Sequence, residues 1–96
     1  MSEENIKDFA QRRREDINTQ ILLKGKGPHP WSSIDLSELA WQEISKEYPN
    51  ETKHFGLVEA VEEIDYLVIS LLAEEKLEIA GWSKGWYGDA LLKTKT

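Results

Sequence analysis

The sequence predicts a single, mostly α-helical domain, spanning residues 1–96, that ends in a short hairpin or flap. Apolar residues recur at helical spacing in three segments, at about residues 3–23, 35–48 and 56–76. Residues 77–96 differ from these segments, because a weak alternation of apolar residues is combined there with several glycines. Together these observations favour three helices that carry the core, followed by a C-terminal element without helix.

The first two helices have clear expected ends. Ser2 is the expected cap of the first helix, and the segment KGKGPHP after Leu23 ends it, because two glycines and two prolines do not continue a helix cheaply. The second helix is expected to begin at Asp35, with Glu38 completing the cap, and to stop before Pro49.

The third segment is the most apolar part of the chain. Its seam follows the spacing of a helical bundle, and further apolar residues lie on its other sides: Leu57, Val61, Ile64, Val68 and Leu71, then Ala60, Leu67, Ile69 and Leu72. Two partner helices do not readily cover so much apolar surface. We therefore expect a three-helix unit of a bundle that is completed by homo-oligomerisation, with a dimer favoured and this helix at the interface.

Composition limits the class of protein. The chain contains no cysteine, which excludes disulfides and cysteine-based zinc sites. The polar start MSEENIKDF does not resemble a signal peptide, and the longest apolar run is shorter than the ~20 residues that span a bilayer. The sequence therefore predicts a soluble cytoplasmic protein without a membrane segment.

The net charge of −6 is unevenly distributed along the chain. Residues 31–80 hold twelve acidic residues and three lysines, whereas both ends of the chain are mildly basic. An acidic centre argues against binding of duplex DNA by the central helices. It suits a basic protein partner or bound cations.

Acidic residues at helical spacing suggest a metal site. Glu62 and Asp65 share one face of the third helix, and this face becomes apolar one turn later; Glu43 and Glu47 share one face of the second helix. Carboxylates near an apolar core repel one another unless a cation compensates them, and oxygen ligands favour Mg²⁺ or Mn²⁺. The alternative is that these acids form solvated helix ends, where they interact favourably with the helix dipole.

The layout resembles the MazG-like all-α NTP pyrophosphohydrolases. The segment Glu62-Glu63-Ile64-Asp65 matches the family's ExxD motif and is followed by an apolar run, and KGKGPHPWSSIDLSELAWQEISKEYP is similar to the preceding loop and acidic helix. The family's ExxE motif is replaced here by an ExxxE, from Glu43 to Glu47. The resemblance therefore implies either a hydrolase or a non-catalytic relative.

The resemblance also implies roles for individual residues. Glu43, Glu47, Glu62 and Asp65 would ligate Mg²⁺, with Glu43 and Glu62 as catalytic residues, and the enzyme would hydrolyse an NTP or dNTP to the monophosphate and pyrophosphate. Lys24 and Lys26 would meet the phosphate oxygens of the nucleotide.

Two other functions remain open. The first is a small acidic interaction protein, an inhibitor or nucleic-acid mimic, that binds a basic protein partner. The second is a winged-helix DNA-binding protein with residues 57–76 as recognition helix and residues 77–94 as wing. The acidity of the third helix argues against the second, because it would face phosphates with carboxylates.

Overall fold

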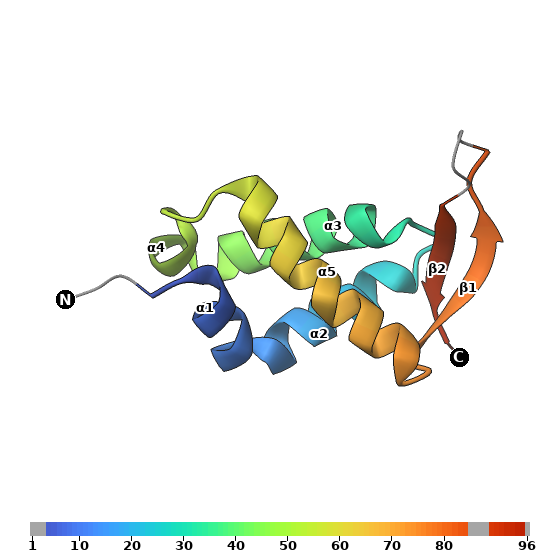
Figure 1. Ribbon diagram of the computed structural model, residues 1–96, viewed down its shortest axis with the longest axis horizontal. Coiled ribbons are helices and arrows are strands. Elements are labelled where there is room, and N and C mark those ends of the chain that lie inside the picture. Colours follow the sequence, from blue (N-terminus) through green and yellow to red (C-terminus); the bar gives the residue numbers. More distant parts are fainter. Residues whose placement is uncertain (1–3, 85–88, 96) are drawn as a thin grey trace.

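The computed structural model describes residues 4–84 and 89–95. Over these residues the chain forms helices that end in an antiparallel hairpin, as Figure 1 shows, which confirms the predicted mostly helical domain. The elements are α1 (Ile6–Arg12), α2 (Arg14–Gly25), α3 (Ser33–Glu47), α4 (Pro49–Thr52), α5 (Leu57–Ala73), β1 (Leu77–Trp82) and β2 (Ala90–Thr94). In this part of the chain, no helix combines the length and the apolar character that crossing a membrane requires.

The core lies where α5 crosses the other helices. α5 packs against α1, α2 and α3, and the hairpin closes the end of the core near the last turn of α5 (Figure 1). The predicted seam is buried apart from its first residue, Leu57, which is 53% exposed. The core side chains are Phe9, Ala10, Ile17, Ile21, Leu36, Ala40, Trp41, Ile44, Ala60, Ile64, Val68, Leu71, Leu77 and Leu92.

The first predicted helix is two helices. α1 ends at Arg12 and α2 begins at Arg14, so the prediction of one helix over residues 3–23 was wrong at this point. At Arg13 the backbone leaves the helical region, and the Arg13 guanidinium lies 4.2 Å from the centre of the Tyr48 ring. Asn5 caps α1, its Oδ1 accepting from the Asp8 amide at 2.8 Å, whereas the predicted start at Ser2 and Glu3 lies outside the described residues.

The second predicted helix begins two residues early. Ser32 is the N-cap of α3, because its Oγ accepts from the Asp35 amide at 3.2 Å. Asp35 is therefore in the first turn and is not the cap, although an acidic residue there also favours the helix dipole. Pro49 ends α3 as predicted, but it also opens the short helix α4, since proline suits the first helical position.

The third predicted helix is shorter than expected at both ends. Glu59 reaches back to the Gly56 amide at 3.1 Å and fixes the start of α5. At the other end, the Glu75 amide donates to the Leu72 carbonyl and the Lys76 amide to the Leu71 carbonyl, with Glu75 in the left-handed region at φ 63°. This is the hydrogen-bond pattern of a Schellman cap. It turns the chain directly into β1.

The hairpin contains an irregularity between Ile79 and Gly81. Ile79 pairs with Leu92, whereas Trp82 pairs with Ala90. Residues that pair directly in an antiparallel ladder share a face, so this bulge places Ile79 and Trp82 on the same face of the hairpin as Leu92 and Ala90. Leu92 also forms an isolated antiparallel bridge with Trp31, which ties the segment before α3 to β2.

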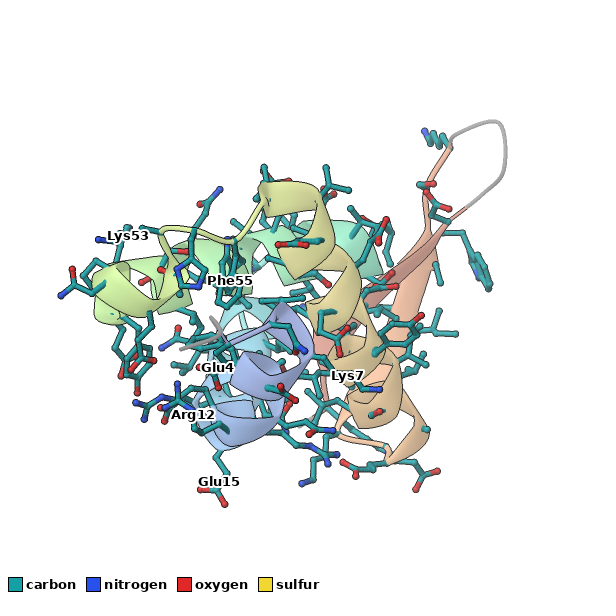
Figure 2. The ribbon with its side chains drawn as sticks, turned by 60° about the vertical axis from the view of Figure 1, so that its left-hand side comes forward. Glu4, Lys7, Arg12, Glu15, Lys53 and Phe55 are labelled. Carbon is teal, nitrogen blue, oxygen red and sulfur yellow. The ribbon has the colours of Figure 1, made fainter. Side chains whose placement is uncertain are left out.

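A polar cluster holds α4 against the junction of α1 and α2. Arg12 bonds Glu4 at 2.7 Å and Glu51 at 3.1 Å, and Arg13 pairs with Glu51 at 3.5 Å. Figure 2 shows Arg12 and Glu4 together on this side of the molecule. The Arg12 hydrogen bond holds the pKa of the Glu4 carboxyl below its usual value. These ion pairs are partly exposed, so each contributes little to stability.

Tyr48 gives this cluster a dependence on alkaline pH. Its hydroxyl donates to the Asp16 carboxylate, and this hydrogen bond, with partial burial, raises the Tyr48 pKa to about 12. In the unfolded chain the phenol ionises near pH 10. The contribution of this hydrogen bond to the free energy of unfolding should therefore be fully present below about pH 10 and should decline as pH rises towards 12. In Tyr48→Phe this part of the decline should be absent from urea denaturation curves measured between pH 9 and 12; an unchanged decline would contradict the assignment.

Candidate functional site

The four predicted metal ligands do not gather in one place. Glu43 on α3 pairs with Lys24 at 3.3 Å and with Lys46 at 3.5 Å. The hydrogen bond and charge of Lys24 hold the pKa of the Glu43 carboxyl below its usual value. Glu43 and Lys24, predicted as a metal ligand and a phosphate contact, are therefore partners of each other.

The remaining predicted site residues are dispersed. Glu47 is the exposed last residue of α3, and Lys26 is exposed just after α2. Glu62 and Asp65 share a face of α5 as predicted. Among residues 4–84 and 89–95, no group of three or more His, Cys, Asp or Glu side chains is placed to hold a metal ion. Ligation of Mg²⁺ by Glu43, Glu47, Glu62 and Asp65 together stays a prediction that this arrangement does not support.

A groove lies beside the start of α5. It is a hollow of about 290 Å³ between the first turns of α3 and α5, and its walls are mostly apolar. Ile34 is 50% exposed, Leu57 53% and Val58 72%. The lining residues are Ile34, Glu38, Leu57, Val58, Val61 and Glu62.

A second hollow continues from the first. It has a volume of about 230 Å³ and lies between the start of α3, the second half of α5 and the start of β2. Ile34 of α3 lines both hollows, so they adjoin at this residue. The second hollow is lined by Ile34, Ile69, Leu72, Asp89, Ala90 and Leu92, together with Ser32 and Ser33. We call the two hollows together the α5 groove.

The α5 groove is apolar with an acidic border. Glu38 and Glu62 line its first hollow and Asp89 its second, and among the residues that the structure describes no lysine or arginine lines either. By helical spacing Asp65 lies between Glu62 and Ile69 on the same face of α5. Its Oδ1 is buried and has no hydrogen-bond partner among the described residues. A buried carboxylate oxygen without a hydrogen-bond partner is unfavourable. A cation beside this partly exposed side chain would offset its charge.

Sequence reasoning singled out Glu62 and Asp65 but missed the apolar residues around them. Val58 and Ile34 carry no signal in the sequence beyond an ordinary place near a helix start. The available signal was the line of residues Glu62, Asp65, Ile69 and Leu72, which changes from acidic to apolar along one face. This pattern is typical of a surface that binds an amphipathic partner as well as of a buried metal site.

Comparisons with known proteins do not identify a relative: no family, no curated protein and no solved structure matches the chain.

Proposed function

We propose that the protein is a non-enzymatic interaction module that binds a protein partner in the α5 groove. The observation that carries the proposal is the row of exposed apolar side chains in this groove, from Val58 at one end to Ile69, 52% exposed, at the other. Contiguous apolar surface with a polar border is typical of protein-binding sites. This is the acidic interaction protein that the sequence offered as an alternative to a hydrolase.

The arrangement of the elements supports a winged-helix type of scaffold. α5 follows α3 in the position of a recognition helix, the hairpin follows α5 as a wing, and Trp31 bridges to β2. Binding of duplex DNA through α5 is disfavoured, because this helix carries Glu59, Glu62, Glu63 and Asp65 and no lysine or arginine. Four carboxylates facing a phosphate backbone would repel it. On such a scaffold α5 instead serves as a protein-binding helix.

Site-specific photo-crosslinking tests the proposal. A benzophenone amino acid replaces Val58 in the α5 groove, and in a matched control it replaces Leu23, which is 52% exposed on α2 and does not line the groove. We expect a discrete protein adduct from Val58, formed in cells of the natural source, that the Leu23 control does not give. The partner, identified by mass spectrometry and purified, should bind the wild-type protein but not the Ile69→Asp variant. Equal adducts at both positions, or equal binding to both proteins, would overturn the proposal.

A magnesium titration separates this function from a pyrophosphohydrolase. A cation that binds only the native state raises the melting temperature by mass action. Because the carboxylates are dispersed, we expect millimolar Mg²⁺ to change the melting temperature no more than NaCl of equal ionic strength does. Asp65→Asn should leave that response unchanged, and nucleoside triphosphates should yield no pyrophosphate. A rise that Asp65→Asn abolishes, together with pyrophosphate release, would restore the metal-dependent hydrolase.

A further inference from the structure

The α5 groove is about as long as a helix of four turns. The residues of α5 that line it lie at positions 57, 58, 61, 62, 69 and 72, and Asp65 shares their helix face by spacing. At 1.5 Å per residue, the 14 steps from Val58 to Leu72 cover about 21 Å. A helix of about four turns matches this length, and apolar residues that recur every three or four positions along all of it would reach both hollows.

The acidic border of the groove favours a ligand that carries positive charge. Glu38 and Glu62 border one end, Asp89 borders the other, and Asp65 lies between them with a buried oxygen that lacks a partner among the described residues. A ligand without cations would cover these carboxylates and leave them uncompensated, which is unfavourable. The Asp65 side chain is partly exposed although its Oδ1 is covered by the protein, so a lysine or arginine opposite it would offset its charge.

The hairpin extends the wall of the groove. Ala90 and Leu92 line the second hollow, and their ladder partners Trp82 and Ile79 share their face of the hairpin. Trp82 is 64% exposed and Ile79 50%, and Figure 1 shows the hairpin extending past the helices. A helix in the groove would therefore end against an apolar wall that includes an indole.

From these features we infer that the ligand of the α5 groove is a basic amphipathic helix of a partner protein, about four turns long, with a lysine or arginine opposite Asp65. This inference rests on the proposed function. A second copy of the chain is a poorer occupant, because pairing α5 with itself would bring Glu62 and Asp65 against the same acids of the other copy.

A synthetic peptide provides the probe. It has 18 residues, leucines at helical spacing and lysines elsewhere; a second peptide has glutamate in place of lysine, and a third has the same composition as the first in scrambled order. Binding is measured by calorimetry and by tryptophan emission. We expect the first peptide to bind, the glutamate peptide not to bind, and the scrambled peptide to bind at least about tenfold more weakly, since its leucines no longer share one face. The change in emission should be reduced in Trp82→Phe.

Matched charge variants locate the binding site. Asp65→Asn and Glu15→Gln each remove one negative charge, but Glu15 lies on α2 and points away from the rest of the molecule in Figure 2. Asp65→Asn removes the expected charge partner of a peptide lysine, so it should weaken binding of the lysine peptide about tenfold or more. Glu15→Gln should leave that binding nearly unchanged. If Asp65→Asn proves to be unfolded by circular dichroism, Glu62→Gln takes its place.

The outcomes distinguish this inference from the proposed function. Equal weakening by Asp65→Asn and Glu15→Gln would mean unspecific attraction and would overturn the inference. So would a dimer in sedimentation that Val58→Asp converts to a monomer, because the occupant would then be a second copy. In the first case a partner-specific adduct at Val58 would still support the proposed function. If Val58 gives no such adduct, the proposed function is overturned, whether or not the peptide binds.

Discussion

Phe9→Ala should lower the free energy of unfolding by about 3–5 kcal/mol, the usual cost of removing a large buried aromatic side chain. Phe9 is fully buried, and three aromatic rings surround it. Its ring centre lies 6.1 Å from that of Trp41, 6.3 Å from that of Tyr48 and 5.6 Å from that of Phe55. The alanine variant would leave a cavity where α1, α3 and the segment before α5 meet.

The size of this loss matters because a domain of this length is marginally stable. Total stabilities of about 5–15 kcal/mol are usual, so the variant should be partly unfolded at 37 °C if the wild type lies near the lower end. Urea denaturation followed by circular dichroism measures the loss. Lys7→Ala, an exposed substitution on the same helix, should stay within about 0.5 kcal/mol of wild type. A loss of less than about 1 kcal/mol for Phe9→Ala would contradict the described core.

The helices were predictable because their apolar periodicity coincides with their burial. Ile17 and Ile21 in α2, and Ile64 and Val68 in α5, are buried as their spacing predicts. The ends of the helices were harder, because Ser32 and Asp35 are both good N-cap residues and local sequence does not choose between them. At the break, Arg13 contacts Tyr48 and Glu51, which come from a distant part of the chain and which local sequence does not reveal.

The candidate site shows a similar limit. Helical spacing correctly placed Glu62 and Asp65 on one face, but it does not say which element faces them. Glu43 was expected to join them, yet it pairs with Lys24, a residue 19 positions earlier whose approach depends on how α2 packs against α3. Periodicity also predicts that Leu57 is buried with the rest of the seam. It is exposed because it lies in the first turn of α5, beside the α5 groove.

Gly25→Ala should be the most damaging substitution in the KGKG segment. A Cβ at Gly25 would lie 2.5 Å from Oγ1 and 3.0 Å from the backbone nitrogen of Thr94, so α2 and β2 would have to move apart. The Thr94 hydroxyl is not free to turn away without cost, because it donates to the Leu22 carbonyl at 2.6 Å. Overpacking of this kind typically costs about 1–3 kcal/mol, and the hydrogen bond would be strained as well.

Gly27→Ala provides the matched control for this substitution. Among the described residues, a Cβ at Gly27 would meet only the Lys24 carbonyl oxygen, at an ordinary contact distance of 3.6 Å, so we expect a change within about 0.5 kcal/mol. Thermal and urea denaturation of the two variants measures the difference. If the KGKG segment instead binds phosphate through its backbone, both glycines would serve mainly to admit the ligand. Stability would then change little, and by a similar amount, in the two variants. A large loss confined to Gly25→Ala would therefore assign this glycine to the close approach of α2 to β2, where the fold needs the absence of a side chain.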